Sequence, residues 1–234
     1  MRKLLVCCTL VVLYTLIGGP VQAASVVLTP ALLNYNVAWG GTTLGEGTLT
    51  LTPEGANCFN YELKTNPIGI VRWVYGSPRE VSNFCVVNGV VVPSRHEFAN
   101  SKRPKDGFVL DFDWKKGLVL GGRNGPLPIT AGTLDRLSIH QAARLWVKQH
   151  AGEKNPGKFT VQIVDHKRIK SYVFAITGRG SVETDSGSFD AIRFERIDDP
   201  NTTLRFWLAP EKDYMPVRVD HVEDGETKLR LSLK

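Results

Sequence analysis

The chain has 234 residues, a formal net charge of +6, 42% hydrophobic residues and 22% charged residues. This apolar fraction excludes a disordered chain. Aromatic residues at 9% and 22 glycines fit a β-rich globular protein better than a coiled coil or a collagen. The length suits one long domain or two short ones, and the composition names no activity.

Residues 1–23 have the pattern of a secretory signal peptide. Two basic residues precede an apolar run over residues 4–17, and Ala23 ends the small-residue pattern of a cleavage site. The run is short for a bilayer span, although an uncleaved anchor helix is the alternative. We therefore expect an exported, periplasmic protein whose single β-rich domain covers residues 24–234.

Two of the four cysteines would leave with that segment. The remaining 211 residues carry a net charge of +4 and contain Cys58 and Cys85. Disulfides persist in exported proteins, and closing this 28-residue loop would stabilise the fold by about 3.6 kcal/mol in the chain-entropy model. We predict a Cys58–Cys85 disulfide, with two buried thiols as the alternative.

Apolar and polar residues alternate with a period of two along most of the remaining chain, which is typical of β-strands. Hairpin signals such as Asn88-Gly89 and Asp224-Gly225 separate the alternating runs. Strands are predicted over residues 33–37, 48–52, 59–63, 81–87, 90–92, 96–100, 108–113, 118–121, 158–164, 171–176, 181–184, 189–196, 203–208, 216–222 and 228–233.

One segment follows a helical period instead. Its apolar residues recur at spacings of three to five, which predicts an amphipathic helix over residues 133–150 with Thr133 as the N-cap. A shorter helix of one or two turns is predicted over residues 67–74. A stripe opposite the apolar face of the main helix contains Arg136, His140, Arg144 and Lys148.

These elements predict a mainly β fold. A single strongly curved antiparallel sheet, an open half-barrel, would wrap around one main amphipathic helix, whose apolar stripe would lie in the concave face. No Pro/Gly/Ser-rich linker divides the chain. Two half-domains split near the helix are the alternative.

Several short pieces of sequence, taken in order, point to a known family. They are residues 36–41 (NVAWGG), 44–51 (LGEGTLTL), 111–114 (DFDW), 132–138 (GTLDRLS), 184–195, 207–210 (WLAP) and 214–219 (YMPVRV). Together they span nearly the whole mature chain and resemble an exported bacterial family catalogued as domain of unknown function 3108. The resemblance implies a fold similar to the half-barrels of periplasmic lipoprotein carriers, which hold an acyl chain between sheet and helix. It implies no agreed activity, and the link to carriers is an analogy of fold.

The acidic pair Asp111 and Asp113 is the one candidate for hydrolytic chemistry. Two positions apart on a predicted strand, the carboxylates share a face, and a glycosidase needs two carboxylates at a set separation. A solvated acidic face opposite buried aromatic residues is the favoured interpretation. No H-x-x-x-H, C-x-x-C or G-x-S-x-G pattern occurs, so we expect no metal, no cofactor and no catalytic residue. These observations favour a non-enzymatic protein.

Asp135 and Arg136 are further polar candidates at the start of the predicted helix. A carboxylate is favourable in a first helical turn, whereas a cation is not, so Arg136 is expected to have a specific partner. Asp113 and Glu195 are the candidates, and an ordinary exposed ion pair is the alternative.

Large apolar side chains supply the candidates for ligand binding. Between a curved sheet and a covering helix they would line an apolar groove, although a packed core explains any single one of them. Trp73 lies in an apolar segment between Pro67 and Gly76 that suits a lid or a rim. The candidates are Trp39, Ile68, Ile70, Trp73, Tyr75, Trp114 and Trp146.

Three functions are therefore considered. The first is non-enzymatic binding of a hydrophobic or amphiphilic envelope component, a lipid or a lipidated protein, between sheet and helix. The second is a structural or interaction protein without a ligand cavity, and the third is the hydrolase. Basic clusters such as Lys102-Arg103, and Lys167-Arg168 with Lys170, are explained mostly as solvated loops and strand ends. An anionic membrane surface or an acidic polysaccharide is the alternative partner for them, and nucleic acid is not expected.

Overall fold

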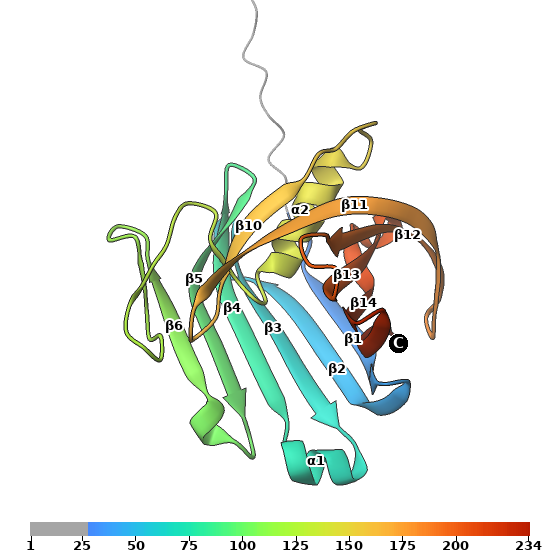
Figure 1. Ribbon diagram of the computed structural model, residues 1–234, viewed down its shortest axis with the longest axis horizontal. Helices are drawn as coiled ribbons and strands as arrows, with labels where there is room; N and C mark the ends of the chain where they lie inside the picture. The colour runs from blue at the N-terminus through green and yellow to red at the C-terminus, as the bar shows by residue number, and fades with distance from the viewer. Residues whose placement is uncertain (1–27) are drawn as a thin grey trace, which may run out of the picture.

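A computed structural model describes residues 28–234, so the predicted signal peptide lies outside the described residues (Figure 1). No helix within this range is long and apolar enough to cross a membrane. The strands are β1 (Ala31–Trp39), β2 (Thr42–Pro53), β3 (Cys58–Pro67), β4 (Pro78–Val87), β5 (Val90–Asn100), β6 (Phe108–Asp113), β7 (Leu118–Leu120), β8 (Leu127–Pro128), β9 (Leu134–Asp135), β10 (Phe159–Val164), β11 (Ile169–Thr184), β12 (Gly187–Arg196), β13 (Thr202–Ala209), β14 (Met215–Glu223) and β15 (Glu226–Leu233). The helices are α1 (Gly69–Tyr75) and α2 (Ile139–His150), with short 3₁₀ turns η1 (Pro104–Asp106) and η2 (Pro210–Lys212).

All these strands form one sheet, in the order β8-β7-β6-β5-β4-β3-β2-β1-β15-β14-β13-β12-β11-β10-β9. Neighbours are antiparallel except β9 and β10, which are parallel. The sheet curls strongly without closing and holds α2 in its concave face (Figure 1). The prediction of a mainly β open half-barrel around one main helix is confirmed, and one sheet runs through both halves of the described chain.

Two pairs of predicted strands are single strands in the structure. Residues 90–92 and 96–100 both belong to β5, which continues through Pro93 because the register with β4 shifts between Asn83 and Phe84. Such a bulge accommodates a residue that lacks an N–H group. Residues 171–176 and 181–184 both belong to β11, where a register shift at Gly178 interrupts the alternation without ending the strand.

The start of the main helix was predicted too early. Leu134 and Asp135 pair with β10, and α2 begins only at Ile139. The Asp135 carboxylate accepts the N–H groups of Leu137 and Ser138, both at 2.8 Å, and so fixes a turn ahead of the helix. Thr133 is therefore no N-cap, and its hydroxyl donates to the Thr130 carbonyl at 2.8 Å instead.

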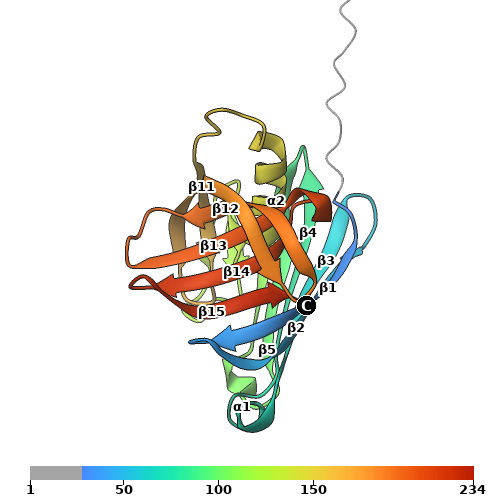
Figure 2. The ribbon, with the colours of Figure 1, turned by 90° about the vertical axis from the view of Figure 1, so that its right-hand side faces the viewer.

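Packing of α2 into the sheet forms the main core. In both views the helix lies between β3–β5 on one side and β10–β12 on the other (Figures 1 and 2). Leu145, Val147 and Ala143 are buried in a cluster that also contains Phe84 and Phe206. Each large apolar side chain buried in this way contributes about 1.5–3 kcal/mol.

The polar stripe of α2 is also partly buried, which the amphipathic pattern did not predict. Arg144 is only 1% exposed. Its guanidinium donates to the Asp213 carboxylate at 2.5 Å and to the Asp213 carbonyl at 2.7 Å, and Lys148 reaches the same carboxylate at 2.5 Å. Burial raises the pKa of Asp213, but hydrogen bonds from Lys148 and Thr29 and the charge of Arg144 hold it below its ordinary value. Asp213 therefore ties the helix to the turn before β14.

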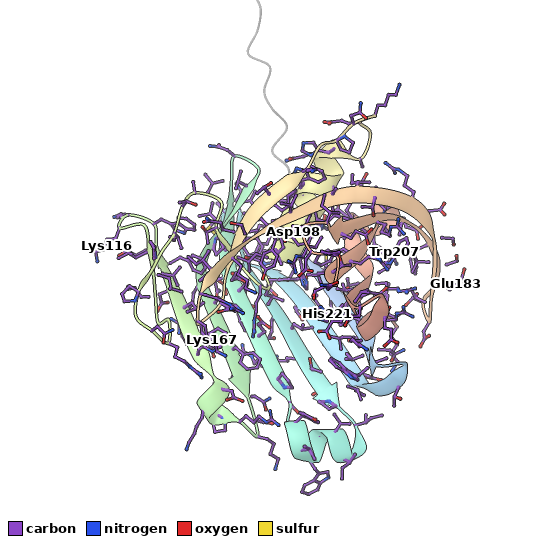
Figure 3. The ribbon with its side chains drawn as sticks, viewed as in Figure 1. Lys116, Lys167, Glu183, Asp198, Trp207 and His221 are labelled. Carbon is purple, nitrogen blue, oxygen red and sulfur yellow. A yellow bond between two sulfur atoms is a disulfide. The ribbon has the colours of Figure 1, made fainter. Side chains whose placement is uncertain are left out.

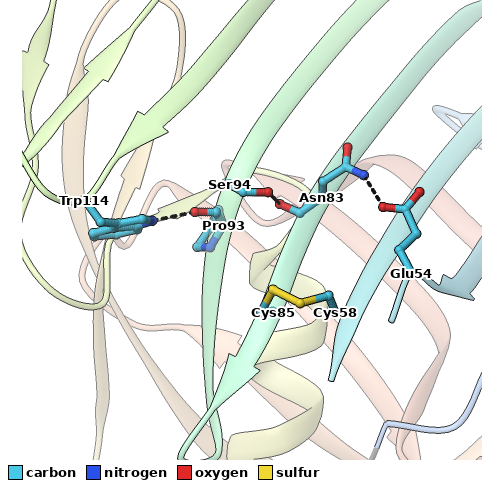
Figure 4. Close-up of a disulfide and its surroundings, with 7 residues drawn as sticks. All are labelled: Glu54, Cys58, Asn83, Cys85, Pro93, Ser94 and Trp114. Atoms are coloured by element: carbon cyan, nitrogen blue, oxygen red, sulfur yellow. Dashed lines mark hydrogen bonds between the residues drawn. A yellow bond between two sulfur atoms is a disulfide. The ribbon is translucent and has the colours of Figure 1, made fainter. Parts of the chain in front are cut away.

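The predicted disulfide is confirmed. Cys58 and Cys85 face each other across β3 and β4 and form a bond with an S–S distance of 2.03 Å (Figure 4). Close by, Asn83 donates to Glu54 at 2.8 Å and the Trp114 indole donates to the Pro93 carbonyl at 2.6 Å. A disulfide in this position fits an exported protein.

Removal of the disulfide is expected to destabilise the fold. The double variant C58A/C85A should lower the free energy of unfolding by about 3.6 kcal/mol, because the unfolded chain regains the entropy of its open loop. Urea denaturation measures this difference, and reduced wild-type protein should unfold like the variant. An unchanged midpoint in both samples would contradict a structural role for the bond.

Loss of the Asp213 charge should lower the free energy of unfolding by at least as much as loss of the disulfide. Asp213→Asn leaves the Arg144 guanidinium buried without its partner, at a cost of about 3–5 kcal/mol. Because the folded pKa of Asp213 is lowered, the difference from wild type should be full at neutral pH. It should shrink as the pH falls below the ordinary aspartate value of 3.8. Asp224→Asn is the matched control, since Asp224 has a similar positive φ but is exposed. Equal losses in the two variants would overturn the assignment.

Candidate functional site

Two of the larger hollows among residues 28–234 lie at the ends of the elements that surround α2. One, of about 360 Å³, lies at the start of α2 beside β10–β14. The other, of about 430 Å³, lies between α1 and the ends of β1–β4. Leu137, Leu145 and Val147 are buried beneath the main helix, and a smaller hollow of about 170 Å³ runs along its side, where Leu145 and Trp146 contribute to the lining. A ligand would therefore lie beside α2 and not under it.

The hollow at α1 is almost entirely apolar. Trp39 is the last residue of β1 and Tyr75 the last residue of α1, and about half of each side chain is exposed. The helix begins at Gly69, whose φ is +52°, two residues after Pro67 ends β3. The lining residues are Val37, Trp39, Leu44, Thr65, Pro67, Val71, Tyr75 and Pro78.

The hollow at the start of α2 combines an apolar floor with cationic walls. Lys170 and Arg196 come from β11 and β12, and Arg136 comes from the turn between β9 and α2. The floor includes Phe174 and Leu204. The remaining lining residues are Ile139, Ile163, Tyr172, Asp199, Thr202 and His221, and His221 is labelled on β14 in Figure 3.

Strand register makes the two hollows neighbours. His221 of β14 pairs with Leu229 of β15, which pairs in turn with Trp39 of β1. Paired residues project from the same face of a sheet, so these three side chains form one row. His221 lines the cationic hollow and Trp39 lines the apolar one. Two strand spacings, about 10 Å, separate them.

Arg136 is exposed, and the partly buried Glu80 and the buried His96 hold it in place. Its Nε donates to Glu80 at 2.7 Å, and Glu80 accepts from His96 at the same distance. The guanidinium also lies 5.0 Å from the centre of the Phe98 ring and 5.3 Å from that of Phe108. Burial raises the pKa of Glu80, yet the His96 hydrogen bond and the Arg136 charge bring it below its ordinary value. The arginine therefore faces the hollow with a fixed orientation.

The partners expected for Arg136 were wrong. Asp113 pairs with Lys116 at 3.1 Å, and Glu195 pairs with Arg205 at 2.5 Å. Arg136 precedes α2 and does not lie in its first turn, so its side chain extends over β4 and reaches Glu80.

Asp135 has a structural position. Its side chain is fully buried. In addition to the two N–H groups of the turn, the carboxylate accepts a hydrogen bond from the Ser82 hydroxyl at 2.7 Å. This contact ties the turn that carries Arg136 to the centre of β4.

The acidic pair of β6 stays apart from both hollows. Asp111 pairs with Arg95 at 2.8 Å, and the N–H and ammonium groups of Lys116 lower the pKa of Asp113. A general acid needs the opposite shift. Within residues 28–234, the histidine–carboxylate pairs use Glu80 and Glu223, and no group of three potential ligands could hold a metal.

The large apolar candidates divide into two groups. Trp39 and Tyr75 line the apolar hollow, and Ile68, Ile70 and Trp73 are exposed on or beside α1. Trp114 and Trp146 lie elsewhere. The Trp114 ring stacks on Phe112 at 5.8 Å, and the Trp146 ring stacks on His150 at 4.4 Å.

Sequence reasoning did not select three residues of the cationic hollow. Lys170 was noted only as part of a basic cluster, and Arg196 and His221 carry no local signal because each lies in an ordinary alternating strand. Their proximity depends on pairing between strands, which a local pattern does not reveal.

His140 should make stability depend on pH. Burial lowers the pKa of His140 to about 4, so the folded protein holds it neutral. Its contribution is complete above the ordinary value of 6.5 and is lost as the pH falls towards 4. Between these limits wild type should lose about 2–3 kcal/mol more than His140→Gln. Denaturant unfolding at several pH values measures this loss, with His150→Gln as the control. Parallel curves for wild type and His140→Gln would contradict the assignment.

Comparisons with known proteins show the fold and the family. A solved beta-barrel-like protein of domain of unknown function DUF1849 from Brucella abortus matches with a TM-score of 0.50 and 13% identity, covering 88% of this chain and 96% of that one. MucB matches with a TM-score of 0.33 and 10% identity, covering 87% of this chain and 51% of that one. None of the curated proteins compared with the chain matches it. The model of the family described as "Protein of unknown function (DUF3108)" matches residues 34–232, and the chain belongs to this family.

Proposed function

We propose that the protein is a periplasmic binding protein that holds an amphiphilic envelope component, a lipid or the lipid part of a lipidated protein, without catalysing a reaction. One observation carries the proposal: an apolar hollow and a cationic hollow are neighbours on one face of one sheet. An amphiphile needs both environments within the length of one molecule. The disulfide and the predicted signal peptide support export.

The apolar hollow would take the hydrocarbon part. Its volume of about 430 Å³ falls within the range of small-molecule sites. Each methylene group removed from water contributes about 0.8 kcal/mol, so six of them would supply about 5 kcal/mol. Trp39 and Tyr75 would close over the chain from opposite sides.

The cationic hollow would take an anionic head group. Glu80 already engages Arg136, and Asp198 and Asp199 already engage Arg196. Lys170 forms no ion pair with any residue from 28 to 234. A single phosphate or carboxylate would therefore find one uncommitted ammonium and two oriented guanidinium groups.

The alternative function is an interaction protein without a ligand cavity. The packed core beneath α2 is compatible with both functions and does not distinguish them. The hollow beside α1 favours the binding protein, because an apolar surface of this kind gains by being covered.

Two soluble amphiphiles test the proposal. Delipidated protein is titrated with palmitoyl lysophosphatidylglycerol, which is anionic, and with monopalmitoylglycerol, which is uncharged. Lys170→Gln should lower the affinity for the anionic ligand about fivefold, or ~1 kcal/mol, and leave the affinity for the uncharged ligand unchanged. Trp39→Ala should lower the affinity for each ligand about tenfold, because both ligands lose the same apolar contact.

Lys167→Gln is the matched control, since it removes the same charge from an exposed position outside the lining of the hollow. Failure of both ligands to bind wild-type protein would refute the proposal. Equal effects of Lys170→Gln and Lys167→Gln would refute the head-group site.

A further inference from the structure

The end of the molecule farthest from α2 carries an exposed apolar surface. This surface is formed by α1 and by Ile68, which directly precedes the helix (Figure 1). We call the surface, together with the neighbouring loop of residues 100–106, the α1 tip. Ile70 and Trp73 are each 77% exposed, and no residue of α1 is buried. Ile68, Val74 and Tyr75 are exposed as well. Exposed apolar residues gathered in this way indicate a binding surface.

The tip is held firmly in this exposed position. The Asn100 amide donates to the Tyr75 carbonyl at 2.9 Å, and the Ser77 N–H donates to the Ser101 hydroxyl at the same distance. Gly76 lies against this loop with a φ of +76°, and a Cβ there would stand 2.3 Å from the Asn100 side-chain oxygen. The apolar side chains therefore project outward from a fixed base.

Cations surround these apolar side chains. The residues at 67–76 and 100–107 include four basic side chains and one acidic side chain, Asp106. The Lys102 ammonium lies 5.5 Å from the centre of the Trp73 ring, and the Arg103 guanidinium lies 5.2 Å from that of Tyr75. The other two cations are Arg72 and Lys105, and both are exposed.

We propose that the α1 tip docks on the surface of a lipid bilayer that contains anionic phospholipids. Ile70 and Trp73 enter the boundary between head groups and acyl chains, and Lys102, Arg103 and Lys105 contact lipid phosphates. Interfacial anchors combine these same features, since tryptophan and tyrosine rings lie at head-group depth and basic side chains meet the anionic surface. Docking requires no ligand in the concave face, so it stands independently of the proposed function.

The arrangement of charge favours a bilayer over a protein partner. Each aromatic ring has a cation beside it, so insertion of the ring places the cation at the level of the phosphates. The same helix lines the apolar hollow through Val71 and Tyr75. A tip docked on a membrane would thus bring that hollow next to the lipid surface.

Vesicle binding tests the proposal with the mature chain. Vesicles of phosphatidylglycerol and phosphatidylethanolamine are compared with vesicles of phosphatidylcholine in flotation assays. The protein should float with the anionic vesicles, and 0.5 M salt should weaken binding. I70S/W73A should weaken it at least tenfold through lost apolar insertion, and K102Q/R103Q at least fivefold through lost charge.

Matched controls come from the opposite end of the sheet. V87S/V90S removes two exposed apolar side chains from the β4–β5 turn, and K115Q/K116Q removes two charges from the β6–β7 turn. Both controls, and Lys170→Gln, should float like wild type. All substituted side chains at the tip are exposed, so circular dichroism should report unchanged folding.

Three results would overturn the proposal. They are no flotation with anionic vesicles, equal flotation of wild type and I70S/W73A, and equal losses in the tip variants and their controls. If the protein does not float with vesicles and instead forms a complex with an envelope protein that Trp73→Ala abolishes, the α1 tip is a protein-docking surface.

Discussion

The fold depends on the packing of one helix into a sheet that would otherwise expose a large apolar face. Fifteen strands curl around α2, and the helix is buried on nearly every side. Such extensive burial creates a difficulty, because buried polar groups on the helix need hydrogen-bond partners. Arg144 resolves it through Asp213, which lies on the opposite half of the sheet from β3 and β4. The helix thus contacts both halves through apolar side chains, and Arg144 and Lys148 pair it with the partly exposed Asp213.

Because α2 occupies only part of the concave face, the rest of that face is free for other contacts. The boundary lies at the turn before the helix, where Asp135 fixes the backbone and Arg136 projects beside the first hollow. Glu80 and His96 then orient this arginine. The same contacts that begin the helix therefore shape the cationic end of the proposed binding site, and the strands beyond it supply the apolar end.

The parts of this structure that local sequence patterns encode were predictable. Alternation predicted most of the strands, and a helical period predicted α2. Predicted export, with two cysteines left in the remaining chain, made a Cys58–Cys85 bond a reasonable expectation. Contacts between distant strands were not. Glu80 lies 56 positions before Arg136, and the row from His221 to Trp39 depends on the pairing of the first described strand, β1, with the last, β15. Charge patterns and hydrophobic periodicity carry no information about which residues pair between distant strands. Sequence analysis therefore identified single candidate residues but not the groups that they form.

Binding of an amphiphile in the concave face, as proposed, can be measured on protein purified from its native cells. Native mass spectrometry, followed by lipid extraction of the same sample, detects the ligand. We expect one reproducible adduct of lipid mass that Trp39→Ala depletes and Lys167→Gln retains. Ligand-free protein in every preparation, together with no uptake of added lysolipid, would contradict it.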